Sequence, residues 1–353
     1  MSSKLRVGVI GMGRAGNKMH FTELKRFPEM FEIVAGCDWD AERRAAAAEA
    51  VPGIRLYEQV KDIVKDPDID LLTIATRSPD HVAHAIMGLE AGKYVVCEKP
   101  IAVCYWDALK LKAAAEKFPG KLFIRHNRRF ETAFSHIREI LATGKLGFVY
   151  EIKLRRHSYD WRKDWQTIAC CGGGQLLNWG PHLIDQSLQF LEAPVESVWS
   201  DLKLVAALGD AEDHLKFILR GTNGRIIDVE ISGGVSIAEP IYCIHGSLGT
   251  LVCKDEKTIT MKYYNGDERP TDSASAENPP IAGGFGGGKK PNWIEEEIPV
   301  KPASGDYTEK IWEYIYNAIN GIAPYPITID QAVEVVRITD MIKAQSRVQD
   351  VRR

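Results

Sequence analysis

The chain has 353 residues, of which 45% are apolar and 26% are charged, and its formal net charge at pH 7 is −3. This composition is typical of a soluble globular protein, and the length allows two domains. The small net charge gives no reason to expect a nucleic acid or an anionic membrane as a partner. No apolar run approaches the roughly 18 to 20 residues of a membrane span, and the N-terminus lacks the features of a signal peptide, so we expect a cytoplasmic protein.

The seven cysteines predict neither a disulfide framework nor a metal site. Their number is odd, no Cys-x-x-Cys motif occurs, and their spacings match no zinc site. We therefore expect reduced thiols and no bound metal. A strained disulfide between the adjacent Cys170 and Cys171 is the alternative.

The first predicted strand, residues 5–10, runs directly into a glycine-rich turn that a helix follows. The turn reads Gly11-Met12-Gly13-Arg14-Ala15-Gly16, which is the dinucleotide fingerprint in its required strand–turn–helix context. Its first glycine permits the tight turn, the second lets a pyrophosphate approach the backbone, and the third lets helix and strand pack closely. These six residues are therefore predicted to bind the phosphates of a dinucleotide cofactor.

A second predicted strand, residues 31–37, ends in Asp38, where an acid would meet the ribose hydroxyls of the adenosine. A carboxylate at this position would repel a 2′-phosphate, so the sequence favours NAD over NADP. Arg43 and Arg44 follow closely enough to keep NADP as an alternative. Both arginines also fit the solvated face of a helix.

Strands and helices continue to alternate up to residue 125. The further strands are predicted at residues 69–75, 94–97 and 121–125, and the helices at residues 78–92 and 105–118. The turn Thr76-Arg77-Ser78 follows the carboxyl end of a strand, which is the ligand-binding edge of such a sheet. Residues 1–125 are therefore predicted to form an α/β Rossmann domain with a doubly wound parallel sheet.

The motif Glu98-Lys99-Pro100 follows the predicted strand 94–97 directly. Proline prevents the strand from continuing, because it cannot donate to the ladder of hydrogen bonds. A charged pair at the carboxyl edge of a parallel sheet can face a ligand. Taken alone, the same pair also fits a solvated turn.

Beyond residue 126 the pattern changes to a run of strands with short turns. Helices are predicted at residues 131–141, 308–320 and 330–346, and strands at residues 147–157, 195–207, 214–220, 225–232, 240–246, 249–254 and 257–263. Such a run predicts an α+β domain over residues 126–353. Its sheet should be large, open and mostly antiparallel, with one face against helices.

Several motifs together resemble those of the glucose–fructose oxidoreductase, inositol dehydrogenase and rhizopine-catabolism (Gfo/Idh/MocA) family of nicotinamide-dependent oxidoreductases. They are Gly11-x-Gly-x-x-Gly16, His81 in Pro-Asp-His-Val-Ala-His, Glu98-Lys99-Pro100, Asn127-Arg-Arg-Phe130 and the segment from Gly172 to Asp185. The resemblance implies that Lys99 is the active-site lysine that the family shares and that the Lys99–Pro100 peptide bond is cis.

The resemblance also implies the cofactor site and the assembly. Glu98 would lie beside the nicotinamide ribose, and the other candidate cofactor-binding residues of this part are Thr76, Ser78, His81, Lys99 and Asn127. Because the second domain of the family often supplies an oligomer interface, we expect a homo-oligomer, either a dimer or a tetramer, through the C-terminal sheet.

In the family, a histidine and an acid four residues before it join the lysine around the reacting carbon. His182 matches the histidine, but Asn178 stands at the acidic position. An amide cannot titrate, so Asn178 can orient a hydroxyl or the imidazole but cannot act as a base. A spacing of four places Asn178 and His182 on one helix face, unless the helix begins only at Pro181.

The substrate site is predicted to include Trp161, Arg162, Trp165, Trp179 and Asp185. The three tryptophans fit a platform for the apolar face of a sugar ring and fit packing between domains equally well. Asp185 fits either a partner that orients the His182 imidazole or a residue at the boundary of the core.

Together these features predict hydride transfer between NAD and a secondary alcohol carbon of a sugar, a glycoside or a cyclitol, with C3 as the candidate carbon of a glycoside. Lys99 and His182 would handle the proton. The alternatives are a glycoside-cleaving enzyme that oxidises its substrate transiently with tightly held NAD, and a non-catalytic dinucleotide-dependent regulator. Residues 267–290 predict a long loop, which would be a lid, an arm for a partner subunit, or disordered chain.

Overall fold

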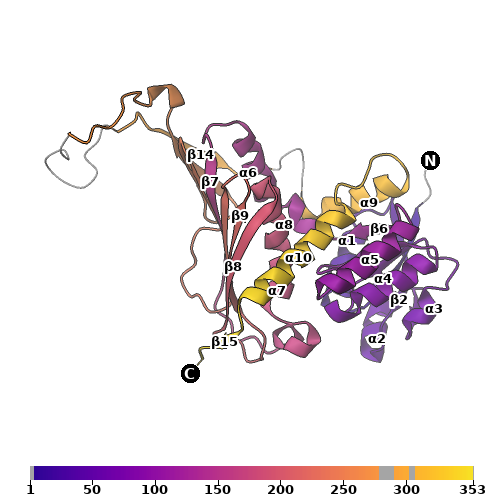
Figure 1. Ribbon diagram of the computed structural model, residues 1–353. Coiled ribbons are helices and arrows are strands. Elements are labelled where there is room, and N and C mark those ends of the chain that lie inside the picture. The colour runs from indigo at the N-terminus through magenta and orange to yellow at the C-terminus, as the bar shows by residue number, and fades with distance from the viewer. Residues whose placement is uncertain (1–3, 278–289, 302–306, 353) are drawn as a thin grey trace.

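The computed structural model describes residues 4–277, 290–301 and 307–352. It contains two sheets in two lobes, and the long helix α10 (Ile329–Gln345) runs between them (Figure 1). Helix α10 contacts strands and helices of both lobes. The two lobes are therefore joined by a shared packed element as well as by the connecting chain.

The first sheet has six strands that pair in parallel throughout. In spatial order they are β3 (Arg55–Tyr57), β2 (Phe31–Cys37), β1 (Leu5–Ile10), β4 (Leu71–Ile74), β5 (Tyr94–Cys97) and β6 (Leu122–Ile124). The strand order reverses between β1 and β4. A reversal of this kind opens a crevice at the carboxyl ends of the strands, where open α/β sheets bind ligands.

Helices cover the first sheet on both faces. They are the π-helix η1 (Arg14–His20), α1 (Phe21–Leu24), α2 (Ala41–Ala50), α3 (Val60–Ile63), α4 (His81–Glu90) and α5 (Tyr105–Lys117). Helix α2 begins after Asp40, whose carboxylate accepts hydrogen bonds from the backbone of Glu42 and Arg43. This capping satisfies backbone donors that the first turn of a helix leaves free.

The second sheet has nine strands. In spatial order they are β14 (Ile294–Pro299), β13 (Thr258–Tyr263), β12 (Gly249–Cys253), β11 (Tyr242–Gly246), β7 (Val149–His157), β10 (Ile226–Ser232), β9 (His214–Gly221), β8 (Val195–Leu204) and β15 (Gln349–Asp350). The β7–β10 and β8–β15 pairs are parallel, and the other pairs are antiparallel.

Helices α6 (Thr132–Ala142), α8 (Gly180–Leu191) and α10 pack their apolar side chains into one core with the second sheet. Helix α9 (Ile311–Ile319) belongs instead to the core of the first sheet, because Ile311, Trp312 and Ile315 are buried there. The core of the first lobe therefore includes residues from the far end of the chain. None of the described helices is long and apolar enough to cross a membrane.

The predicted fold class is confirmed, with a parallel Rossmann sheet and a second, mostly antiparallel sheet. Strands β3 and β14 were not predicted, because β3 has only three residues and β14 reads Ile-Glu-Glu-Glu-Ile-Pro with little apolar alternation. Helix α8 begins at Gly180, so Asn178 lies in the preceding short helix α7 (Gln175–Asn178). The division of the chain at residue 125 stays a prediction.

The predicted long loop 267–290 lies largely outside the described residues, which exclude 278–289. Its described beginning follows β13 and projects away from both sheets (Figure 1). All seven cysteines are free thiols, so adjacent Cys170 and Cys171 form no disulfide.

Candidate active site

The glycine-rich turn fits the phosphates of a dinucleotide. At Gly11, whose φ is +90°, an added Cβ would lie 2.6 Å from the Ala75 carbonyl oxygen, and at Gly16 it would lie 2.0 Å from the Gly11 oxygen. At Gly13 it would meet only the end of the Arg43 side chain, at 3.8 Å. The outer glycines therefore serve the turn and its packing, whereas Gly13 leaves backbone open to a ligand.

Asp38 is fixed at the carboxyl end of β2 with its carboxylate toward this turn. Its Oδ2 accepts a hydrogen bond from the Met12 backbone at 2.8 Å, and its Oδ1 accepts one from the Asp40 backbone at 3.0 Å. This placement fits the ribose hydroxyls of an adenosine. The Arg43 guanidinium lies 3.6 Å from Asp38 Oδ2, so it could also meet a 2′-phosphate.

His81 joins the turn after β4 to the turn after β5. Its Nδ1 lies 2.7 Å from the Pro100 carbonyl oxygen and its Nε2 lies 3.1 Å from the Thr76 carbonyl oxygen. Burial lowers the pKa of His81, so the ring is neutral and donates to one of the two carbonyls. The Lys99–Pro100 peptide bond that this contact holds is cis, as the resemblance implied.

Glu98 is a buried carboxylate with three hydrogen-bond partners. Its Oε1 receives His20 Nε2 at 2.9 Å and Arg125 Nη1 at 2.7 Å, and its Oε2 receives the Lys99 backbone N–H at 3.2 Å. Burial alone would raise the pKa of Glu98, but Arg125 and His20 hold it well below its usual range. Glu98 is therefore an anion at neutral pH.

The Lys99 amine points to the second lobe and not to Glu98. Its Nζ donates to the backbone carbonyl of Asn178 at 2.9 Å, which joins the carboxyl edge of the first sheet to the chain before α8. Burial lowers the pKa of Lys99 to about 8; Glu98 opposes this effect, and Arg128 and Arg125 add to it. A fraction of Lys99 is therefore neutral near physiological pH and can accept a proton.

His182 lies in the first turn of α8, beside Trp179, whose ring centroid is 5.9 Å from that of the imidazole. Its Nδ1 is buried and has no hydrogen-bond partner among the described residues. Burial, with the charges of Lys99 and Arg128, holds the pKa of His182 well below its usual value. The ring is therefore a neutral imidazole that can accept a proton from a ligand.

His126 was not predicted as a site residue. It follows β6, next to the turn that carries Lys99, and within the described chain neither of its buried ring nitrogens has a hydrogen-bond partner. Burial lowers its pKa to about 4. The signal in the sequence was the polar pair Arg125-His126 directly after a strand of a parallel sheet, the same signal that singled out Glu98 and Lys99.

The predicted tryptophans are not gathered into one platform. Arg128 and Arg156 lie over the Trp179 ring at 4.2 Å and 5.3 Å from its centroid. Trp165 carries the guanidinium of Arg77 at 5.6 Å, and Trp161 is 74% exposed. Trp179 and Trp165 are thus engaged by arginines rather than left bare for a sugar ring.

The other predicted site residues lie at different depths. Asp185 is buried and paired with Arg129, whose Nε donates to it at 3.0 Å, so it faces the core boundary. Thr76 is partly buried, and Ser78 and Asn127 are buried at the carboxyl edge of the first sheet. Asn178 accepts a hydrogen bond from the Gln166 side chain at 3.4 Å.

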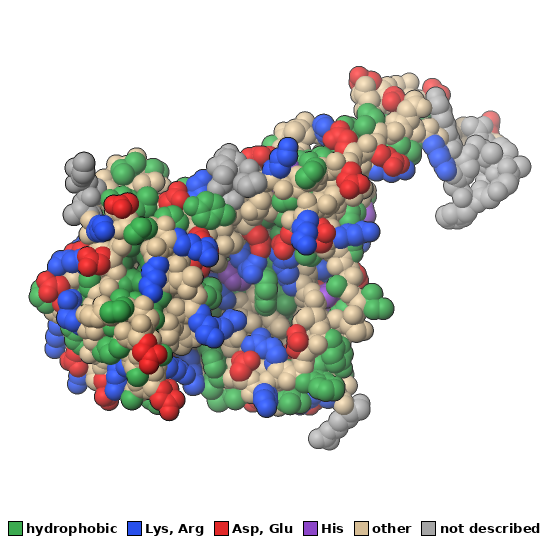
Figure 2. Space-filling view, turned by 180° about the vertical axis from the view of Figure 1, so that it is seen from behind, with side chains coloured by type: hydrophobic (Ala, Val, Ile, Leu, Met, Phe, Trp, Pro, Cys, Tyr) green, Lys and Arg blue, Asp and Glu red, His purple; other side chains and the backbone are tan. Residues whose placement is uncertain are grey.

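A polar pocket beside Asn178 is lined by residues that include Arg162, Gln166, Gln175 and Glu212. Seen from behind, the surface is hollowed between the two lobes, and basic and histidine side chains are visible in the hollow (Figure 2). The structure thus brings Lys99, Asn178 and His182 to one place between the lobes.

Comparisons with known proteins agree with this arrangement. Residues 5–126 match the family model described as an oxidoreductase family with an NAD-binding Rossmann fold, and residues 134–252 match the GFO/IDH/MocA C-terminal domain. The chain is 28% identical to the uncharacterized oxidoreductase YdgJ of Escherichia coli, over 97% of this chain and 96% of that protein.

Two further comparisons cover nearly the whole chain. The scyllo-inositol 2-dehydrogenase (NADP(+)) IolW of Bacillus subtilis is 26% identical over 97% of this chain and 94% of its own length. The crystal structure of an NAD-binding protein from Listeria innocua is 25% identical, covers 97% of this chain and 94% of that chain, and has a TM-score of 0.81.

Proposed function

Because this chain belongs to the Gfo/Idh/MocA family of oxidoreductases, with an NAD-binding Rossmann domain, we propose that it transfers a hydride between NAD and a secondary alcohol carbon of a sugar, a glycoside or a cyclitol. The observation that carries this proposal is the hydrogen bond from Lys99 Nζ to the Asn178 carbonyl. It brings an amine of the first lobe, neutral in part near physiological pH, to the segment of the second lobe that carries the neutral imidazole of His182.

Lys99 and His182 share the handling of the hydroxyl proton. Oxidation of an alcohol releases that proton, and either neutral group can accept it; in reduction the protonated form of the same group returns it. When bound, the nicotinamide supplies the hydride chemistry. Asn178 cannot titrate, so it holds a neighbouring hydroxyl of the substrate rather than acting as a base.

The cofactor choice is NAD first, with NADP as the alternative. Asp38 is a fixed carboxylate where a 2′-phosphate would lie, which favours NAD. The nearby Arg43 works in the opposite direction, and the relative IolW is named for NADP. Competition between the two cofactors in a binding assay decides between them.

The small polar pocket beside Asn178 shows which side chains a bound hydroxyl would meet there. Its lining of Arg162, Gln166, Gln175 and Glu212 offers both donors and acceptors, as sugar and cyclitol hydroxyls require. For a glycoside, C3 is the candidate carbon, and analysis of the oxidised product tests it. Names of the relatives support the same class, since IolW acts on an inositol and another relative is a 1,5-anhydro-D-fructose reductase.

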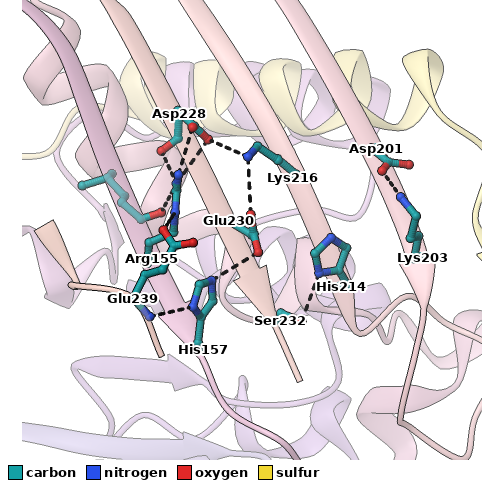
Figure 3. A network of polar contacts seen from close by, with 11 residues as sticks. Arg155, His157, Asp201, Lys203, His214, Lys216, Asp228, Glu230, Ser232 and Glu239 are labelled. Carbon is teal, nitrogen blue, oxygen red and sulfur yellow. Dashed lines mark hydrogen bonds and ion pairs between the residues drawn. The ribbon is translucent and has the colours of Figure 1, made fainter. Parts of the chain in front are cut away.

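We also propose a cytoplasmic homo-oligomer that forms through the second sheet. Helices α6, α8 and α10 share a core with one face of this sheet, and the other face carries polar and charged side chains of the same chain (Figure 3). Sedimentation of the purified chain tests this point, and a monomer at micromolar concentration would contradict it.

A screen of sugars, glycosides and inositols tests the proposed reaction, with NADH absorbance as the signal. It should run with and without a carbonyl acceptor, because tightly bound cofactor would hide net reduction. Without the acceptor we expect NADH from at least one polyol; with it, a tightly bound cofactor would be recycled, so the oxidised polyol and the reduced acceptor should accumulate. Release of free sugar from a glycoside without net NADH would contradict the proposal and favour glycoside cleavage.

A further inference from the structure

Arg125 is the centre of a buried network behind the Glu98–Lys99 turn. The guanidinium is only 1% exposed, and it pairs with Glu98 through Nη1 and with Glu23 through Nη2. Glu23 also accepts the indole N–H of Trp312 at 2.7 Å, and the guanidinium lies 5.7 Å from the centre of that ring. Besides Glu98, Arg125 is thus held by Glu23 and Trp312, neither of which is a predicted site residue.

The network draws on distant parts of the chain. Glu23 lies in α1, just beyond the helix that follows the phosphate turn, and Trp312 lies in α9, 289 residues later. His20 completes the network, because its Nε2 meets Glu98 and its Nδ1 lies 3.1 Å from the Thr73 hydroxyl. The position of the Glu98 carboxylate and the charges around it therefore depend on η1, α1, β4, α9 and the segment after β6.

This arrangement bears on Lys99, because a lysine next to a buried carboxylate would ordinarily form an ion pair and remain an ammonium. The groups whose charges act most on Lys99 are Glu98 directly after β5, Arg128 and Arg125 after β6, and Arg14 of η1. His81, His126 and His182 are titratable neighbours whose own pKa values Lys99 lowers. Only one of these seven groups is an acid, and that acid is already paired twice.

We propose that Arg125, anchored by Glu23 and Trp312, is a positioning residue for Lys99: by pairing with Glu98 it cancels the attraction of that carboxylate for the amine, and it thereby keeps Lys99 free to exchange a proton. The role of this proton exchange in turnover rests on the proposed function, whereas the charge balance itself does not. Lys99 accordingly donates to a carbonyl oxygen rather than to Glu98.

The charge balance predicts opposite effects on the pKa of Lys99 for substitutions of Arg125 and of Glu23. Arg125→Gln removes the positive charge, so Glu98 should hold the Lys99 ammonium and raise the pKa of Lys99 by about one unit. Glu23→Gln removes a competing carboxylate with almost no change of shape, so Arg125 should neutralise Glu98 more fully and lower the pKa of Lys99. General loosening of the site would move both variants in the same direction, toward an ordinary lysine.

The test measures how readily Lys99 is acetylated at each pH, by trace labelling of the whole chain with acetic anhydride and mass spectrometry of the peptide that contains Lys99. It needs neither substrate nor cofactor, so its failure is distinguishable from a failure of the proposed reaction. We expect a midpoint near pH 8 in the unaltered chain, a higher midpoint in Arg125→Gln and a lower one in Glu23→Gln.

Arg155→Gln is the matched control, because it also removes a buried, twice-paired arginine but lies on the second sheet. It should leave the Lys99 midpoint unchanged. If Arg125→Gln does not fold, Glu23→Gln alone decides, since its lowered midpoint is the effect that loosening cannot produce. Midpoints that do not move, or that rise in both variants, would overturn the proposal.

Discussion

Two buried arginines in this molecule form similar ion-pair networks in different surroundings. Arg125 in the first lobe pairs with Glu98 and Glu23, and Arg155 in the second sheet pairs with Asp228 at 2.9 Å and with Glu239 at 3.1 Å (Figure 3). Both guanidinium groups are buried and each is shared by two carboxylates. Burial and pairing alone therefore do not distinguish a reaction site from a structural network.

The networks differ in what lies beside them. Around Arg155, Lys216 lies within 3.7 Å of Asp228 and 3.5 Å of Glu230, so acidic and basic side chains alternate across the sheet (Figure 3). The buried His157 Nε2 has no hydrogen bond in the described chain, but it lies 3.4 Å from a carboxylate oxygen of Glu230. Beside Arg125, the buried nitrogens of His126 and the Nδ1 of His182 have neither a hydrogen bond nor an ion pair among the described residues.

Unpartnered buried polar groups cost free energy and persist where a ligand or a proton transfer uses them. The neighbourhood of Arg125 combines them with a lysine whose pKa is lowered to about 8. The comparison therefore teaches that the proposed reaction site differs from the second-sheet network in its imidazoles, which in the described chain lack both a hydrogen bond and a carboxylate within ion-pair distance, and not in the ion pairs themselves.

Lys99→Ala gives the largest expected effect. If Lys99 handles the proton, turnover should fall by about 10²–10⁴, because general acid–base catalysis contributes on that order. NAD binding, followed by tryptophan fluorescence, should still be measurable, because Lys99 is only one of the predicted cofactor contacts and Asp38 and the glycine turn are untouched. Normal turnover with intact NAD binding would show that Lys99 does not handle the proton.

Arg155→Gln tests the other side of the comparison. Removal of one partner from a buried ion pair leaves an uncompensated charge, so the free energy of unfolding should fall by about 3–5 kcal/mol. Turnover per folded molecule should not change. Denaturant unfolding and active-site titration measure the two quantities, and a loss of turnover without a loss of stability would show that the two networks do not differ in the way described.

The pH dependence of oxidation sharpens the comparison further. Lys99 can accept a proton only when its amine is neutral. If the hydroxyl proton goes to Lys99, kcat/KM for oxidation should fall about tenfold for each pH unit below pH 8 and level off above it, whereas transfer to the neutral His182 would leave the rate unchanged over this range. His182 should add no second limb near neutral pH, because its pKa lies well below its usual value. If kcat/KM does not change between pH 6 and 9 and yet falls in Lys99→Ala, Lys99 has a role other than proton transfer.

The smallest expected effect concerns His157 on the second sheet. His157, with His214 and Lys216, lowers the pKa of Glu230 to about 2. The Glu230 carboxylate therefore stabilises the folded state above the ordinary pKa of a glutamate, and this contribution is lost as the pH falls from 4.5 toward 2. In His157→Gln the loss of stability over that range should shrink by less than about 1 kcal/mol, because Glu230 is partly solvated. Acid unfolding of both chains, with turnover at neutral pH as the control, measures it.

The local parts of the site could be predicted from the sequence. The glycine turn needs only adjacent residues, and Asp38 and the Glu98–Lys99 pair follow from strand ends that meet at one edge of a parallel sheet. The cis peptide bond before Pro100 came with the family resemblance and is confirmed.

The remaining parts depend on which distant residues the fold brings together. Nothing in the sequence pairs Trp312 with Glu23, 289 residues apart, yet that contact helps to hold Arg125 behind Lys99. The contacts of Arg128 and Arg156 with the Trp179 ring could not be predicted for the same reason. They require β7 and the turn after β6 to come together at the residue before α8.

The most direct test of the central claim is chemical rescue of Lys99→Ala by small primary amines, with NADH formation from the best polyol substrate as the readout. If Lys99 exchanges the proton of the substrate hydroxyl, added amines should restore part of the lost rate, and the restored rate should depend on the pKa of the amine. An NADH rate in Lys99→Ala that equals that of the unaltered chain, or that no amine changes, would contradict the account.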